Sequence, residues 1–148
     1  MNRRPVHAFD SALWIYWIQE SEKFLPAVAP LMRDLREGRI AVVTSVLSQV
    51  EVLTRAFAKG DDVLARRYRD FFENTDGIAV LDVDQEIAEG AARLRARYAL
   101  RTPDAIHLST ALAARASAFV TTDRRLARIR EIEVRVLRPV TPRARPRK

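Results

Sequence analysis

The sequence predicts one α/β domain in which a mostly parallel central sheet of about five strands carries helices on both faces. Five short apolar runs rich in β-branched residues have the length of buried strands. Between them lie stretches with apolar residues three and four positions apart, which indicates amphipathic helices. Strands that alternate with helices are typical of a parallel sheet covered by helices. The length of 148 residues allows one domain with a core but is too short for two ordinary ones.

The predicted strands are VHAF, IAVVT, IAVLDV, AFVTT and VRVL, at residues 6–9, 40–44, 78–83, 118–122 and 134–137. Helices are predicted over 11–19, 24–36, 45–59, 61–73, 85–98 and 103–115, and a short helix over 124–129. Gly38, Gly60 and Gly77 stand where helices are expected to end. The domain is therefore expected to span residues 1–140. The basic, proline-rich segment TPRARPRK, residues 141–148, is expected to be a disordered tail that is either exposed to solvent or binds RNA.

Composition narrows the class of protein. The formal net charge of +7 predicts a polyanionic partner, with nucleic acid ahead of an acidic protein segment. The absence of cysteine excludes disulfides, thiolate zinc sites and thiol nucleophiles, and it fits a cytoplasmic protein. The N-terminal region has no uninterrupted apolar run, so neither a signal peptide nor a membrane span is predicted.

Four acidic residues are expected to meet at one edge of the sheet. Asp10 and Asp123 directly follow predicted strands, and Asp104 begins the helix that leads back into the fourth strand. Glu51 lies among apolar residues in the helix after the second strand. The carboxyl ends of parallel strands share an edge, where the functional crevice of such sheets lies. Each acid also has a simpler interpretation, because three could start helices and Glu51 could lie on a solvated face.

Carboxylates gathered in one pocket repel one another and retain protons unless a cation offsets their charge. Oxygen ligands without cysteine or histidine favour Mg²⁺ or Mn²⁺ over zinc. Such a metal on a basic protein indicates phosphodiester chemistry, since it can polarise a phosphate oxygen and activate water near neutral pH.

Four segments carry a resemblance to a known family. VHAFDSALWIYWIQ, TSVLSQVEVLTRA, TPDAIHLSTALA and AFVTTDRRL resemble the four acidic blocks of PIN domains, and specifically of VapC-type toxins from toxin–antitoxin pairs. The resemblance extends from about Val6 to Leu137, and its last two blocks are the most specific. The chain departs from the family at Ala12, where Ser or Asn is frequent, and at His7, in a strand that is usually apolar.

The resemblance implies a PIN-like fold and a metal-binding catalytic quartet made of Asp10, Glu51, Asp104 and Asp123. Ser11 and Thr121 would support these acids or orient the substrate. The implied activity is that of a Mg²⁺- or Mn²⁺-dependent endoribonuclease toxin that cuts tRNA or ribosomal RNA. The implied partners are the RNA, a cognate antitoxin and a second copy of the chain in a homodimer.

Several residues keep two interpretations. Arg101, Arg124 and Arg125 flank the acidic edge and form either an RNA-binding rim or an ordinary charged surface. His107 follows Asp104 by one turn, and we expect a packed or hydrogen-bonded imidazole rather than a general base. Trp14 and Trp17 are expected in the core, with a dimer or antitoxin contact as the alternative.

Two other functions remain open at the level of the sequence. One is a housekeeping PIN-type nuclease that processes RNA or cleaves DNA. The other is a non-catalytic module that binds nucleic acid or protein, in which the acids only start helices. The binding module predicts no stabilisation by metal, whereas both nucleases predict it.

Overall fold

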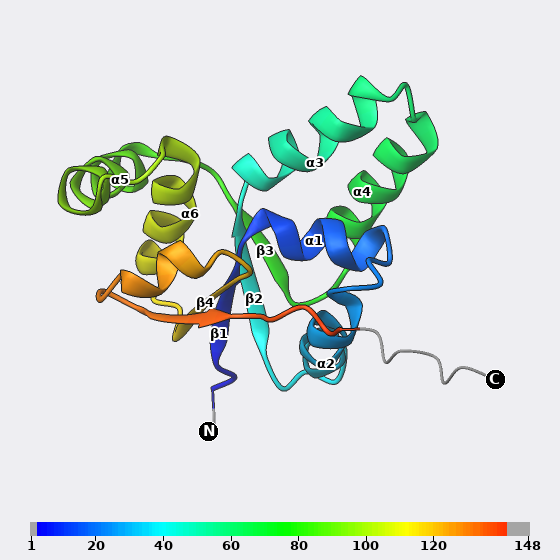
Figure 1. Ribbon diagram of the computed structural model, residues 1–148, viewed down its shortest axis with the longest axis horizontal. Helices are drawn as coiled ribbons and strands as arrows, with labels where there is room; N and C mark the ends of the chain where they lie inside the picture. Colours follow the sequence, from blue (N-terminus) through cyan, green and yellow to red (C-terminus); the bar gives the residue numbers. More distant parts are fainter. Residues whose placement is uncertain (1–2, 142–148) are drawn as a thin grey trace.

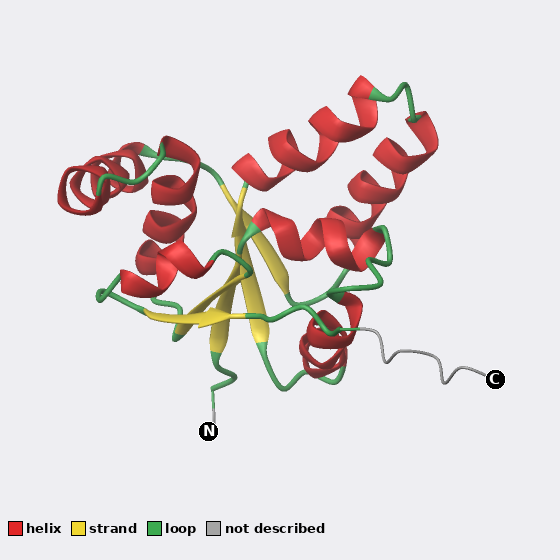
Figure 2. Cartoon of the chain, in the orientation of Figure 1, coloured by secondary structure: helices red, strands yellow, loops and turns green. Residues whose placement is uncertain are grey.

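The computed structural model describes residues 3–141 as a parallel sheet with helices packed on both faces (Figures 1 and 2). The strand order is β3-β2-β1-β4-β5, and all four neighbouring pairs are parallel. The strands are β1 (Val6–Phe9), β2 (Ala41–Ser45), β3 (Ile78–Leu81), β4 (Ala118–Thr121) and β5 (Glu133–Val136). This confirms the predicted fold class. The expected tail falls, from residue 142 onward, outside the described residues.

The helices follow the predicted pattern closely. They are α1 (Ser11–Ile18), α2 (Leu25–Arg36), α3 (Leu47–Ala58), α4 (Asp62–Asn74), α5 (Gln85–Tyr98) and α6 (Thr102–Ala113), with a short 3-10 helix η1 (Arg124–Arg128). Most boundaries differ from the predicted ones by one or two residues, and one residue changes its type of element: Ser45 is the last residue of β2 rather than the first of a helix. It pairs with Leu81 of β3, and the N–H of Val46 donates to the Leu81 carbonyl, so pairing prolongs the strand beyond its apolar run.

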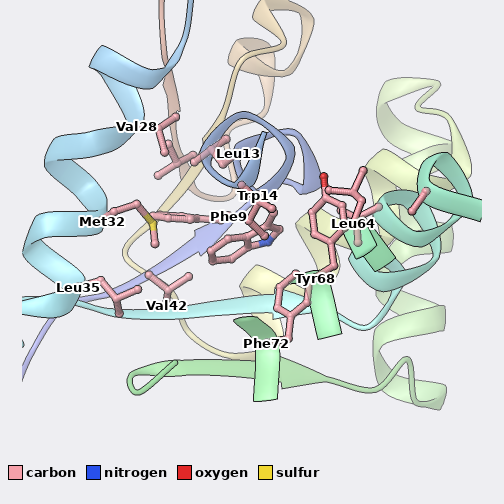
Figure 3. Packing of buried hydrophobic residues seen from close by; sticks show 14 of the residues in the cluster. Phe9, Leu13, Trp14, Val28, Met32, Leu35, Val42, Leu64, Tyr68 and Phe72 are labelled. Atoms are coloured by element: carbon pink, nitrogen blue, oxygen red, sulfur yellow. The ribbon is translucent and has the colours of Figure 1, made fainter. Parts of the chain in front are cut away.

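The two faces of the sheet have separate cores because successive strand residues point to opposite sides. Phe9, Val42 and Val120 pack with α1 to α4, whereas their neighbours Phe119 and Ala8 pack with α5, α6 and η1. Figure 3 shows the first core, in which Trp14 lies between Phe9 and the α4 residues.

Trp14 is fully buried, as the sequence predicts. Its Nε1 donates a 3.1 Å hydrogen bond to Oγ1 of Thr44, so the indole N–H is satisfied inside the core. Trp17 is only partly buried against the same core. The core prediction is therefore met by Trp14 and only partly by Trp17.

Helix α6 packs directly against α5 at Gly90. A Cβ placed on Gly90 of α5 would overlap with Oγ of Ser109 on α6, so a larger residue would have to displace this hydroxyl. The Ser109 hydroxyl donates a 2.8 Å hydrogen bond to the Ile87 carbonyl of α5. These contacts fix α6, the helix that carries Asp104 and His107.

The order of the strands defines where a ligand would bind. The chain builds β1, β2 and β3 outward on one side and then returns to place β4 on the other side of β1. Crevices of open α/β sheets lie at the carboxyl end of such a reversal. In Figure 1 this end of β1 lies between α6 and α3. Within residues 3–141, no helix is long and apolar enough to cross a membrane.

Candidate active site

All four predicted acids lie near the carboxyl edge of the sheet. Asp10 directly follows β1, and its N–H donates a 2.9 Å hydrogen bond to the Val120 carbonyl of β4. Asp123 lies two residues beyond the end of β4, and Asp104 is in the first turn of α6. Glu51 extends from α3, which begins just after β2. The elements thus bring three strand ends and one helix start to one place.

Side-chain capping explains only one of the three aspartates. Asp10 is at the N-cap position of α1, but its side chain makes no capping hydrogen bond. Asp104 lies inside the first turn of α6, where a negative charge is favoured by the helix dipole, and Arg101 is the N-cap residue. Only Asp123 caps, because its Oδ1 accepts a 3.0 Å hydrogen bond from the N–H of Arg125.

Two hydroxyl groups connect the acids. Oγ1 of Thr121 donates to Oδ2 of Asp10 at 2.7 Å and accepts from the N–H of Asp123 at 3.1 Å. Oγ of Ser11 donates to Oε2 of Glu51 and lies 3.4 Å from Oδ1 of Asp10. Ser11 and Thr121 therefore have the contacts expected of groups that orient the carboxylates.

His107 is a member of this cluster that the sequence did not place beside Glu51. Its Nε2 lies 2.8 Å from Oε1 of Glu51, and because a carboxylate only accepts, Nε2 is the donor. The imidazole is buried, with 3% of the residue exposed. The spacing of three residues from Asp104 on one helix was the available signal, since it places both side chains on the same face.

Burial and neighbouring groups shift the pKa values of Asp10 and Glu51 in opposite directions. Burial raises the pKa of Asp10, and the charges of Glu51 and Asp104 add to this, while His107 and Thr121 partly oppose it. Burial alone would also raise the pKa of Glu51, but its hydrogen bonds from His107 and Ser11 outweigh burial and lower the pKa. Glu51 is therefore held as an anion, and Asp10 is the acid whose ionisation a cation would assist most.

Two of the predicted arginines pair with the outer acids. Nε and Nη2 of Arg125 donate to Oδ1 and Oδ2 of Asp123 at 3.0 and 2.8 Å, and these bonds lower the pKa of Asp123. Nε of Arg101 donates to Oδ2 of Asp104 at 3.4 Å. All four side chains line one small cavity of about 70 Å³. Arg124, by contrast, does not line this cavity and is exposed.

The donor set fits a hard divalent ion, but its arrangement in this structure is not yet that of a metal site. Every acid offers carboxylate oxygens, the ligands that such an ion prefers, and the half-buried Asp10 has a pKa that is raised mainly by burial. Within residues 3–141, no three Asp, Glu or His side chains are arranged to hold one metal ion. Asp104 and Asp123 are instead directed to Arg101 and Arg125. The quartet as a ligand set stays a prediction.

Comparison with solved structures shows that the fold is shared with toxin–antitoxin complexes. A chain of VapBC2 from Rickettsia felis, bound to a DNA fragment from its promoter, matches with a TM-score of 0.73 at 14% identity, covering 89% of this chain and 98% of that one. A toxin–antitoxin complex from Klebsiella pneumoniae matches with a TM-score of 0.63 at 23% identity, covering 83% and 92%. VapBC-5 from Mycobacterium tuberculosis matches with a TM-score of 0.57 at 19% identity, covering 90% and 98%.

A comparison with curated proteins finds no match. The model of the PIN domain family, however, matches residues 8–132, a region that begins in β1, ends just before β5 and contains all four acids. This confirms the resemblance that the four acidic segments carry. The chain belongs to the PIN-domain family, whose members are generally nucleases.

Proposed function

We propose that this chain is a Mg²⁺- or Mn²⁺-dependent endoribonuclease of the VapC type, a toxin that hydrolyses phosphodiester bonds of tRNA or ribosomal RNA. One observation carries the proposal. Asp10 is half-buried where the strand order of a PIN sheet reverses, and burial, followed by smaller contributions from the charges of Glu51 and Asp104, raises its pKa. A cation bound among these acids would offset their charge.

Asp10, Glu51, Asp104 and Asp123 would hold the ion. When bound, the ion supplies a Lewis acid for a phosphate oxygen and lowers the pKa of a coordinated water. Thr121 and Ser11 orient the carboxylates of Asp10 and Glu51 through the hydrogen bonds described above.

Arg101 and Arg125 are suited to bind the RNA backbone at the rim of this site. Their side chains are both 69% exposed, so each can reach a ligand in solution. A planar guanidinium can bind a phosphate through two hydrogen bonds, as that of Arg125 binds the Asp123 carboxylate. Arg124 is the weaker candidate of the three, because it lies outside the cavity that the acids line.

The proposal includes an antitoxin, a homodimer and a cytoplasmic location. Support for the antitoxin comes from the structural neighbours, which are toxin–antitoxin complexes. A surface that suits such a partner lies over α1, α2 and α4, where two cavities of about 460 and 560 Å³ share Trp17 and Phe71. Large aromatic side chains in a concave surface are typical anchors of protein interfaces.

The test compares the wild type with Asp104→Asn, measuring the melting temperature with and without Mn²⁺ and the cleavage of a tRNA and rRNA mixture. A metal that binds only the folded protein at a hundredfold excess over its Kd stabilises it by about 2.7 kcal/mol. We expect this shift in the wild type, and we expect Asp104→Asn to lose both the shift and the cleavage while its metal-free melting temperature is kept.

The matched control is Asp84→Asn. Asp84 caps α5 through a 2.8 Å hydrogen bond from the Ile87 N–H and does not line the cavity of Asp104 and Asp123, so this amide variant should keep both metal response and cleavage. Cleavage by Asp104→Asn at the wild-type rate would overturn the assignment of the activity to this group of acids. Expression of the chain alone should arrest growth, and a small co-expressed antitoxin should relieve the arrest. A chain that cleaves RNA without arresting growth would instead be an RNA-processing nuclease.

A further inference from the structure

Glu51 has both carboxylate oxygens bound by donors from other elements. His107 of α6 donates to Oε1 at 2.8 Å, and Ser11 of α1 donates to Oε2. The two donors approach from opposite ends of the carboxylate, so they determine its position and its rotation together. A third partner can reach the group only through the remaining lone pairs.

Among the four acids, Glu51 is the one that most needs such support. It has one more rotatable bond than the aspartates, and 34% of its side chain is exposed. Ordering a free glutamate side chain costs conformational entropy. A partner that orders the side chain in advance removes this cost from the binding of a ligand.

His107 is fixed firmly enough to do this. It lies on α6, whose residues Ala105, Leu108 and Ala111 are fully buried, and α6 is held against α5 by the contact of Gly90 with Ser109. The imidazole therefore has little freedom of its own. Because the ring is fixed by the packing of α6, its hydrogen bond also fixes the Glu51 carboxylate, which extends from a different helix.

The geometry does not suit His107 to acid–base chemistry. Its Nε2 is engaged by Glu51, and its Nδ1 is buried, with no hydrogen-bond partner among the described residues. Neither nitrogen is open to water or RNA, as a general base must be. The ring acts only through the carboxylate that it touches.

We propose that His107 is a positioning residue that holds the Glu51 carboxylate in place to receive the divalent cation. The inference rests on the proposed function, because it requires that Glu51 binds a metal. It predicts that the length of the donor side chain at this position, rather than its mere presence, determines metal affinity.

The experiment measures the Kd for Mn²⁺ by titration calorimetry on the full chain, together with the metal-free melting temperature. His107→Gln can place an amide N–H near the position of Nε2, whereas His107→Asn, shorter by one methylene, cannot. We expect His107→Gln to stay within about threefold of the wild-type Kd, and His107→Asn to weaken binding about 10- to 100-fold. His107→Phe, which has no donor, should behave like His107→Asn.

A double-mutant cycle tests whether the effect passes through Glu51. In a Glu51→Gln background, His107→Asn should cause no further loss of Mn²⁺ affinity, because the group that it positions is already altered. Thr110→Val is the matched control on the same helix. It removes a buried hydroxyl that donates to the Ile106 carbonyl of α6 itself, so it should leave the Kd unchanged, and its metal-free melting temperature reports any loss of stability.

The outcomes separate the inference from the function on which it rests. Equal Mn²⁺ affinity in His107→Asn and His107→Gln, or full additivity with Glu51→Gln, would overturn the positioning role and leave the nuclease intact. If the wild type binds no Mn²⁺, with or without RNA, the proposed function itself fails and the inference with it. The metal-free melting temperatures of His107→Asn and His107→Gln show whether the two variants also differ in folding.

Discussion

Thr121, at the end of β4, joins two acids that follow different strands. Its hydroxyl donates to Oδ2 of Asp10 at 2.7 Å, and the same oxygen accepts from the N–H of Asp123 at 3.1 Å. One hydroxyl thus uses its donor on one acid and its acceptor on the backbone of the other. The side chain is fully buried, so water cannot replace either bond. The relative placement of Asp10 and Asp123 therefore depends on this residue.

We expect Thr121→Val to impair the site and Thr121→Ser to preserve it. Valine has nearly the same shape but leaves the half-buried Asp10 carboxylate without this donor, which costs about 0.5–1.5 kcal/mol of folding free energy. Loss of an orienting partner of this kind lowers metal affinity or activity about 10- to 100-fold. Urea unfolding and Mn²⁺ titration of the two variants measure these effects. Wild-type values for Thr121→Val would show that the bridge does not support the site.

Arg125 is expected to compete with the metal while assisting the RNA. Its two hydrogen bonds occupy both oxygens of Asp123, so Arg125→Gln should free this carboxylate and strengthen Mn²⁺ binding about two- to fivefold, the range of an exposed ion pair. The same variant should weaken RNA binding, because it removes a phosphate-binding group. The opposite signs distinguish this role from a general loss of charge.

Arg124→Gln is the control for charge. It removes the same formal charge from the adjacent position of η1, which does not line the acidic cavity. Mn²⁺ affinity should be unchanged in Arg124→Gln. An equal gain in both variants would mean that long-range charge, rather than the bond to Asp123, opposes the cation.

His7 should make the fold less stable in mild acid. Burial lowers its pKa below the ordinary 6.5, and Arg135 adds to this, while Glu133 and Asp34 partly oppose it. The neutral His7 side chain contributes to the free energy of unfolding above pH 6.5, and this contribution is lost as the pH falls through and below that value. The reason is that the unfolded chain then binds a proton at His7 that the folded chain resists. The buried Nδ1 of His7 has no hydrogen-bond partner within residues 3–141, which is consistent with a neutral ring.

The variant His7→Val tests this prediction, since valine suits a buried parallel strand. The midpoint of urea unfolding should fall less between pH 7 and pH 5 in His7→Val than in the wild type. If the two proteins lose the same stability between these pH values, another group is responsible for the acid sensitivity.

The contact between α5 and α6 predicts a mutation and its suppressor. Gly90→Ala should destabilise the fold by about 1–3 kcal/mol, because the new methyl group overlaps with the Ser109 hydroxyl. Adding Ser109→Ala removes the overlapping oxygen, so the double variant should be more stable than the sum of the single effects allows. Unfolding free energies from urea titrations of the four proteins measure this coupling. If the changes in unfolding free energy of the two single variants simply add up in the double variant, the new methyl group does not clash with the Ser109 hydroxyl.

The arrangement of strands and helices was predictable from the sequence because each element carries a local signal. The run AFVTT has the composition of a buried strand, and α6 has the repeating apolar positions of a buried helix. The convergence of Asp10 and Asp123 followed from the rule that parallel strands end at one edge. The end of β2 at Ser45 was not predictable, because it depends on pairing with Leu81 of another strand.

The sequence by itself determined the fold class, the family and the edge of the sheet on which the acids lie, since periodicity and motif spacing are properties of neighbouring residues. The tertiary structure decided which partner each acid has. His107 and Glu51 are 56 positions apart, and Thr121 and Asp10 are 111 apart. These bonds exist only because α6 packs beside α3 and β4 pairs with β1. No local sequence pattern predicts these hydrogen bonds, because they depend on how separate elements pack in space.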